Sequence, residues 1–153
     1  MQTFDIIIVG GGMVGASLAL ALRSSNLKIA LVDRNPFSAS LINTESPWKN
    51  RVSALNEASV TLFEALGVWQ SMLSQRVCPF DHMTVWDREG TGEITFDAPS
   101  VQRDVIGYIV ENDVVQQALR IAVEASDIHS FWGEESVRFQ FCLLYTSPSP
   151  RDS

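Results

Sequence analysis

The sequence is poor in the residue types that build several common kinds of site. It contains two cysteines and two histidines in 153 residues. Cys78 and Cys142 are too few for a disulfide framework, so we expect a reducing compartment. His82 and His129 lie far apart and have no paired cysteines beside them, so no metal site is predicted.

Positive charge is also scarce. Eleven Lys and Arg stand against 18 Asp and Glu, which gives a formal net charge of −7. No basic run is visible, and this argues against a nucleic-acid surface. No apolar run reaches the roughly 18 residues of a membrane span. The first nine residues lack a basic leader and a cleavage site, so we expect no signal peptide.

The most informative pattern occupies the first 34 residues. An apolar segment at 3–9 runs directly into a glycine-rich turn at 10–15, which matches G-x-G-x-x-G. An alanine- and leucine-rich stretch at 16–22 predicts a helix, and a second apolar run at 28–32 ends at Asp33. The order strand, glycine turn, helix, strand and acid predicts a dinucleotide site.

Each part of this pattern has a physical role. Gly10 can adopt the backbone angles of a tight bend, Gly12 lets a pyrophosphate approach, and Gly15 lets the helix pack closely on the strand. The free N–H groups at the helix start attract phosphates. Asp33 follows Gly15 by 18 residues (33 − 15) and can accept hydrogen bonds from an adenosine ribose. The alternative is a glycine-rich turn without a ligand, in which Asp33 begins the turn at 33–36.

Periodicity in the rest of the chain predicts further elements. In chain order, we expect a loop over 36–50, a helix over 56–66 between an Asn56 N-cap and a Gly67 stop, a helical turn over 68–73, a hairpin of 83–86 with 93–97, an extended segment over 108–110, a helix over 112–124 and a strand over 128–132. The hairpin interrupts the nucleotide-binding pattern, so we expect a second sheet that lies over the nucleotide fold.

Two sets of apolar side chains are expected in the core. The first helix should face a sheet through residues spaced by three and four: Val14, Leu18, Ala21 and Leu22. The aromatic residues of the strand segments should pack internally: Trp86, Phe96 and Tyr108.

The end of the chain has a different composition. From Phe141 onward it becomes rich in Ser, Pro and Thr. The eleven residues 142–152 resemble, codon by codon, the translation of a transposase-type sequencing adapter. We therefore expect 141–153 to be a non-native tail. The alternative is a natural disordered tail or linker, which the composition would also suit.

Three segments together resemble one family. They are the opening DIIIVGGGMVGASLALAL at 5–22, R-V-S-A-L at 51–55, and the pair VWDREGTGEITFDA at 85–98 with GYIVENDVVQQAL at 107–119. The chain resembles the class A flavin monooxygenases of the para-hydroxybenzoate hydroxylase type. Within that group it is most similar to the FAD-dependent hydroxylases of ubiquinone biosynthesis.

The resemblance implies an α/β fold, a Rossmann-like FAD-binding fold with an inserted β-hairpin. Residues 1–140 would be a partial FAD-binding domain with the start of the substrate-domain sheet. Two later family motifs, an Asp-Gly and a Gly-Asp segment, are not in the chain. We therefore expect a truncated, inactive part of a two-domain monooxygenase.

The resemblance also implies a set of cofactor-binding residues: Gly10, Gly12, Met13, Val14, Gly15, Asp33, Arg34, Arg51 and Asn112. Arg51 would lie near the flavin and its phosphates; the alternative is a surface salt bridge. Asn112 would touch the FAD ribityl chain at a helix start; the alternative is a simple N-cap. Glu111 before it could be a first-turn charge without a ligand.

For the intact enzyme, the resemblance implies that NAD(P)H and O₂ are consumed to hydroxylate the ring of a polyprenylated phenol. No catalytic residue is assigned, because the cofactor performs the bond-making. The expected absence of a leader suggests a bacterial cytoplasmic protein. A lipid-tailed substrate suggests that it associates loosely with the inner membrane or with a ubiquinone-biosynthesis complex.

Three alternatives stay open. One is a flavin hydroxylase of another aromatic substrate, and one is a non-catalytic nucleotide-binding module. The third, an NAD-dependent dehydrogenase, is disfavoured because regular βαβ units do not continue after Asp33.

Overall fold

The computed structural model describes residues 2–38 and 47–134. Its elements in chain order are β1 (Ile6–Val9), α1 (Met13–Leu22), β2 (Ile29–Asp33), β3 (Val52–Leu55), α2 (Glu57–Leu66), α3 (Trp69–Leu73), β4 (Val77–Phe80), β5 (His82–Trp86), β6 (Glu93–Asp97), η1 (Pro99–Val101), β7 (Gly107–Glu111), α4 (Asn112–Glu124) and β8 (His129–Trp132). The predicted tail, 141–153, and the middle of the predicted loop, 39–46, lie outside the described residues.

The nucleotide-binding pattern forms a three-stranded parallel sheet in the order β1-β2-β8. β2 is central and almost wholly buried, as expected for an apolar strand covered on both faces. In the register between β2 and β8, Asp33 stands opposite Trp132. Because the strands are parallel, their carboxyl ends and the glycine turn meet at one edge of the sheet.

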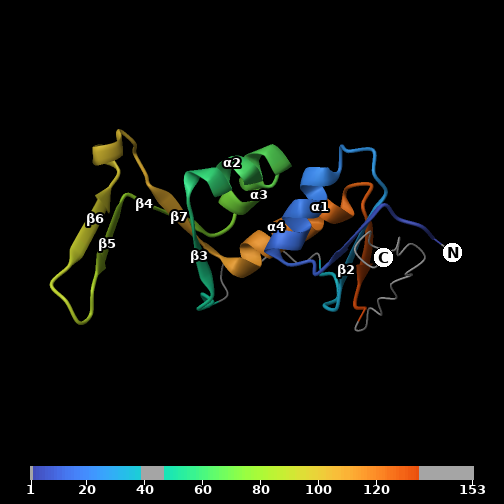
Figure 1. Cartoon of the computed structure of the whole chain (residues 1–153), viewed down its shortest axis with the longest axis horizontal. Helices are drawn as coiled ribbons and strands as arrows, with labels where there is room; N and C mark the ends of the chain where they lie inside the picture. Colours follow the sequence, from blue (N-terminus) through green and yellow to red (C-terminus); the bar gives the residue numbers. More distant parts are fainter. Residues whose placement is uncertain (1, 39–46, 135–153) are drawn as a thin grey trace, which may run out of the picture.

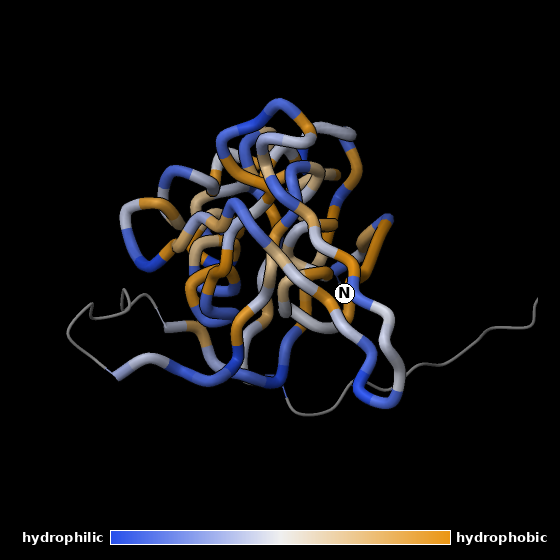
Figure 2. Tube along the Cα trace, turned by 90° about the vertical axis from the view of Figure 1, so that its left-hand side faces the viewer, coloured by the Kyte–Doolittle hydropathy of each residue, from blue (hydrophilic) through white to orange (hydrophobic). Residues whose placement is uncertain are grey.

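The helices α1 and α4 pack against each other and against this sheet (Figure 1). Fully buried Leu20, Leu31 and Leu119 connect α1, β2 and α4 into one core. The same core extends to α2 and α3 through Phe63 and Met72. Figure 2 shows apolar segments concentrated in the interior of the trace and polar segments at its outer turns.

The predicted buried face of α1 is wrong for Val14, Leu18 and Ala21, which are exposed, whereas Leu22 packs at the edge of the core. Ala16, Ala19 and Leu20 are buried, whereas Val14 is 83% exposed and Leu18 is also exposed. The helix is apolar around most of its circumference, so periodicity cannot select a face. The small alanine side chains face inward, where α1, the sheet and α4 approach closely.

A second sheet is antiparallel, in the order β3-β7-β4. The sequence predicted β7 as an extended segment but missed β3 and β4. β4 contains Pro79, and a proline argues against a central strand. Among the described strands, β4 pairs only with β7, which makes it the kind of edge strand where proline is tolerated. The predicted caps of α2 are confirmed: Ser59 N donates to Asn56 Oδ1 over 3.0 Å, and Gly67 ends the helix at φ +78°.

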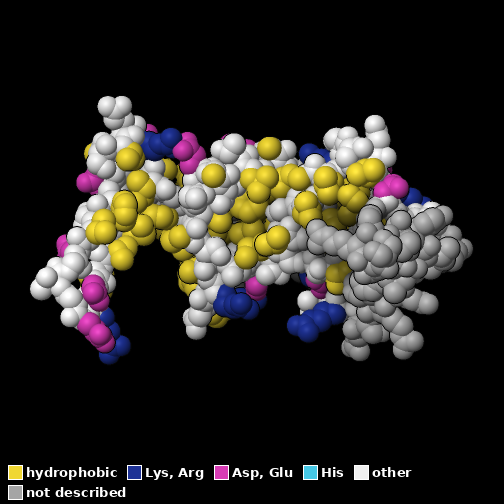
Figure 3. All heavy atoms as spheres, in the orientation of Figure 1, with side chains coloured by type: hydrophobic (Ala, Val, Ile, Leu, Met, Phe, Trp, Pro, Cys, Tyr) yellow, Lys and Arg dark blue, Asp and Glu magenta, His cyan; other side chains and the backbone are white. Residues whose placement is uncertain are grey.

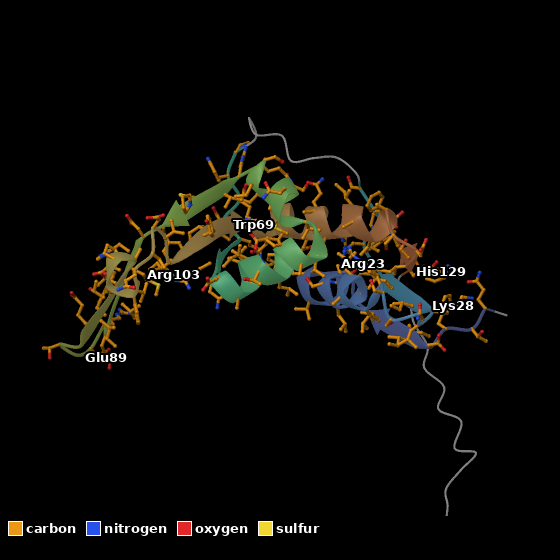
Figure 4. The ribbon with its side chains drawn as sticks, turned by 90° about the horizontal axis from the view of Figure 1, so that it is seen from above. Arg23, Lys28, Trp69, Glu89, Arg103 and His129 are labelled. Atoms are coloured by element: carbon orange, nitrogen blue, oxygen red, sulfur yellow. The ribbon has the colours of Figure 1, made fainter. Side chains whose placement is uncertain are left out.

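The predicted hairpin of β5 and β6 is confirmed, but its predicted place is wrong. It lies at the opposite end of the molecule from the parallel sheet rather than over it (Figure 1). Figure 4 shows Glu89 at one extremity and Lys28 and His129 near the other.

The hairpin leaves apolar side chains on the surface, as the space-filling view in Figure 3 shows. Trp86 is 70% exposed and Phe96 is also exposed, so their predicted core positions are wrong. A two-stranded ribbon has no second layer to cover its faces. Tyr108 does pack internally, edge-on to Trp69 with ring centroids 5.1 Å apart. Among the described residues, no helix has the length and hydropathy needed to cross a bilayer.

Candidate functional site

The glycine turn has the geometry that its sequence predicted. Gly10 adopts φ +104°, a region that favours glycine, and its N–H donates to the Val32 carbonyl over 2.7 Å. A Cβ on Gly15 would stand 1.9 Å from the Gly10 carbonyl oxygen. A Cβ on Gly12 would meet nothing within 4 Å. The protein itself therefore excludes a side chain at Gly15, whereas the space at Gly12 is open to a ligand.

The start of α1 offers free donors beside that space. The first backbone bond of the helix runs from Ala16 N to the Gly12 carbonyl, over 3.0 Å. The N–H groups of Met13, Val14 and Gly15 precede this bond and have no intrahelical acceptor. Their direction and the helix dipole favour an anion. This arrangement fits a pyrophosphate, the group that FAD would place there.

Asp33 lies at the end of β2 and is only 8% exposed. Its carboxylate accepts from Gly11 N (2.5 Å), Asn35 N (2.7 Å) and Arg120 Nη2 (3.1 Å). Burial alone would raise the pKa of Asp33. The two N–H donors and the Arg120 cation outweigh burial and lower that pKa below its ordinary value of 3.8. A carboxylate offers about four acceptor positions, so about one is left for a ribose hydroxyl.

The sequence did not reveal Arg120, which lies on α4 and reaches the glycine turn. Its Nε donates to the Gly11 carbonyl over 3.1 Å, and its guanidinium lies 4.7 Å from the Trp132 ring centroid. A Cβ on Gly11 would stand 2.4 Å from the Trp132 ring. The signal for this cluster was the strand order, because parallel pairing of β8 with β2 brings Trp132 level with Asp33.

A second group of predicted residues gathers where α4 begins. The Arg51 carbonyl, just before β3, accepts from Asn112 N over 3.0 Å, and Ser53 Oγ lies 2.6 Å from Asn112 Oδ1. The N-cap alternative for Asn112 is wrong: it is the first helical residue, and Glu111 holds the cap position without a side-chain cap bond. The side chains of Arg51 and Arg34 are exposed.

Glu111 is not the simple first-turn charge that its position suggested. It is 2% exposed, pairs with Arg76 (Nη1 to Oε2, 3.4 Å) and accepts from Lys49 N over 2.7 Å. The Arg76 guanidinium lies 4.6 Å from the Trp48 ring centroid. Burial, the Arg76 partner and the bond from Lys49 N indicate that this carboxylate holds the chain before β3 in place.

The structure thus brings the predicted residues together as two groups joined by α4. The turn group contains the glycines and Asp33, and the second group contains Arg51 and Asn112. Asn112 and Arg120 are eight residues apart, which is roughly 12 Å along a helix axis. Two groups at this spacing suit the two halves of an extended dinucleotide. Their part in binding FAD stays a prediction.

Among the cavities of the described residues, two of the larger ones lie away from the turn group. One, of about 730 Å³, opens at the other end of α1, between Leu27, Leu66 and Asp127. The other, of about 320 Å³, has mostly apolar walls where the hairpin meets the second sheet, including Leu55, Phe80 and Phe96. Neither is lined by a predicted cofactor-binding residue.

Comparison with known proteins decides the family. The sequence model described as FAD dependent oxidoreductase matches residues 5–82. The chain belongs to this family of FAD-dependent oxidoreductases. The α/β fold and the cofactor class implied by the resemblance are thereby confirmed.

Relatives of this FAD-dependent oxidoreductase narrow the resemblance. It is 39% identical over 127 residues to the 3-demethoxyubiquinol 3-hydroxylase of Escherichia coli (strain K12). This alignment covers 81% of this chain and 31% of that protein. It is 36% identical over 154 residues to the mitochondrial ubiquinone biosynthesis monooxygenase COQ6 of Xenopus tropicalis. That alignment covers 96% of this chain and 31% of the relative. The chain therefore spans about a third of the length of these relatives, and the predicted resemblance to ubiquinone-biosynthesis hydroxylases is confirmed.

Solved structures support the same fold. The oxidoreductase resembles PqsL, a probable FAD-dependent monooxygenase from Pseudomonas aeruginosa, with a TM-score of 0.63, 16% identity, and coverage of 86% of this chain and 33% of that one. It also resembles the flavin-dependent monooxygenase PieE, solved with FAD and substrate, with a TM-score of 0.59, 19% identity, and coverage of 85% and 24%.

Proposed function

We propose that this chain supplies the FAD-binding part of a monooxygenase that hydroxylates the aromatic ring of a polyprenylated phenol in ubiquinone biosynthesis. The observation that carries the proposal is the 39% identity to a 3-demethoxyubiquinol 3-hydroxylase across most of the chain. The intact enzyme would use NAD(P)H and O₂. Residues 1–140 would form the FAD-binding part together with the start of a second sheet.

The residues of the turn group would hold the adenosine and pyrophosphate of FAD. Gly10 and Gly15 shape the turn, Gly12 leaves room for the pyrophosphate, and the N–H groups at the start of α1 donate to it. The remaining acceptor position of Asp33 would take a ribose hydroxyl. Arg34 would lie beside this end of the cofactor.

The second group would hold the other half of the cofactor. The exposed guanidinium of Arg51 would offset phosphate or flavin charge, and the Asn112 amide would contact the ribityl chain. The buried Glu111–Arg76 pair would support both residues, because Glu111 precedes Asn112 in the chain and pairs with Val52, the residue after Arg51, between β7 and β3. Bound FAD supplies the oxygen-transfer chemistry, and the chain's own residues bind and orient it.

The same proposal includes a peripheral association with the inner membrane or with a biosynthetic complex. The support is chemical, because a polyprenylated substrate partitions into lipid. The exposed apolar side chains of the hairpin, Trp86 and Ile94 among them, are compatible with such a surface.

The test is a chimera. Residues 1–134 replace the matching N-terminal segment of the Escherichia coli relative, and the chimera is produced in cells that lack that enzyme. Restored ubiquinone formation, together with a bound flavin absorbance in the purified chimera, supports the proposal. A folded chimera that carries FAD but leaves ubiquinone unformed contradicts the substrate class and favours another aromatic substrate. A folded chimera without FAD contradicts the cofactor role.

A further inference from the structure

Arg120 makes an unusual set of contacts for a helix side chain. It donates to the carboxylate of Asp33 and to the carbonyl of Gly11, both over 3.1 Å, and to the carbonyl of Pro36 over 3.5 Å. Its side chain is only 13% exposed. One guanidinium therefore connects the glycine turn, the end of β2 and the loop that follows β2.

The guanidinium is itself held in place by Trp132. Arg120 stacks on one face of the indole, and Glu124, one helical turn further along α4, accepts the indole N–H over 2.7 Å. The ring also packs against Gly11, which leaves no room for a Cβ there. A stacked, planar guanidinium keeps its fork in one orientation, which a flexible ammonium does not.

The geometry points to a positioning role: we propose that Arg120, stacked on Trp132, fixes the Asp33 carboxylate and the glycine turn in the arrangement that receives the adenosine end of FAD. This inference rests on the proposed cofactor site. Asp33 Oδ1 accepts from both Arg120 and Asn35 N, whereas Oδ2 accepts only from Gly11 N. The position left free is on Oδ2, so the three donors together select which oxygen can meet a ribose hydroxyl.

The contacts distinguish this role from simple packing. Gly11 in the glycine turn is bonded on both sides: its N–H donates to the Asp33 carboxylate, and its carbonyl accepts from Arg120. Loss of the guanidinium would free the carboxylate to rotate and would loosen the turn. Binding of the ribose hydroxyls should then weaken more than binding of the phosphates.

The experiment measures binding of ADP, 2′-deoxy-ADP and 3′-deoxy-ADP to the 153-residue chain by calorimetry, with FAD binding followed by quenching of flavin fluorescence. We expect the wild-type chain to prefer ADP to at least one deoxy analogue. Arg120→Gln should weaken ADP binding by about tenfold and remove most of that preference. In the Asp33→Asn background, the same substitution should cause little further loss.

Arg23→Gln is the matched control, because Arg23 also donates to a backbone carbonyl, that of Leu66, but at the other end of α1. It should leave all affinities unchanged. If Arg120→Gln does not fold, as judged by circular dichroism, Arg120→Lys takes its place; it keeps the charge without the fork and should lose the same preference in part.

The outcomes separate this inference from the proposed function. A folded Arg120→Gln chain with the wild-type affinity and the wild-type preference for ADP overturns the positioning role alone. So does an equal loss for ADP and both analogues, since that result indicates a merely structural residue. A wild-type chain that binds neither ADP nor FAD overturns the proposed cofactor site, and the inference falls with it.

Discussion

A side chain on Gly15 would place its Cβ 1.9 Å from the carbonyl oxygen of Gly10. The obstacle is backbone, which no rotamer change can move. Gly15 is therefore required by the way α1 crosses the end of β1, whether or not a ligand is bound. Gly12, three residues earlier in the same motif, has open space at the corresponding position. Two glycines of one motif are thus required for different reasons: Gly15 by the packing of the protein itself, and Gly12 by the space proposed for a ligand.

Gly15→Ala should destabilise the chain. Alanine in a helix ordinarily gains up to about 1 kcal/mol over glycine. Here the overlap with Gly10 should outweigh that gain, since overpacking costs about 1–3 kcal/mol and more against backbone. Urea unfolding followed by circular dichroism measures the net loss. A Gly15→Ala variant as stable as the wild type would show that α1 can move away from the turn.

Gly12→Ala should leave folding nearly intact and damage binding. The site is the N-cap of α1, where replacing glycine by alanine costs less than about 1 kcal/mol. The added methyl group would occupy the space proposed for the pyrophosphate, so ADP affinity should fall by more than about tenfold. Urea unfolding of the variant checks the predicted stability, and calorimetry with ADP checks the predicted loss of affinity. Unchanged ADP affinity would place the ligand elsewhere.

Much of the glycine turn and of the longer helices could be predicted from sequence because their signals are local. The glycine turn, the Asn56 and Gly67 caps of α2, and the helix at 112–124 all follow from residues within a few positions of each other. β3 and β4 were missed because each is four residues long, and β4 carries Pro79. Strands this short are specified by their common partner, β7.

The part of the candidate site that the backbone of the glycine turn forms could be predicted from the sequence. The part formed by side chains from distant segments of the chain could not. Arg120 meets Asp33 across 87 positions and Gly11 across 109. No spacing rule connects such residues; only the strand order and the packing of α4 on α1 do. The same applies to Glu111, whose partner Arg76 lies on the approach to a strand that the sequence did not reveal.

Gly11→Ala should be rescued in part by removal of the Trp132 ring. The new Cβ would stand 2.4 Å from the far edge of the indole and 3.1 Å from the Asp33 Cβ. Trp132→Leu removes the first contact and keeps the second. The double variant should be more stable than the sum of the single effects by about 1 kcal/mol or more. Additive losses in urea unfolding would show that the ring does not restrict Gly11.

The ionised carboxylate of Asp33 should stabilise the fold at neutral pH. Its pKa in the folded chain is held below the ordinary 3.8, so its contribution is present above that value and is lost as pH falls through the folded pKa. Arg120 is the cation that contacts it directly. The stability difference between wild type and Asp33→Asn should be constant from pH 7 to about pH 5 and should shrink below about pH 4. A difference that grows on acidification would contradict the lowered pKa.

Two Glu–Arg pairs among the described residues differ mainly in burial, and that contrast tests how the second group is held together. Glu111 and Arg76 are at most 5% exposed, whereas Glu57 and Arg103 are both well exposed. Glu111→Gln removes a buried charge partner while keeping the side-chain shape, so it should cost about 3 kcal/mol in urea unfolding. Glu57→Gln, the matched control, should cause no measurable loss, because water screens an exposed pair. Equal effects of the two substitutions would mean that the Glu111 carboxylate does not anchor the chain before β3, and Arg51 would then need another support.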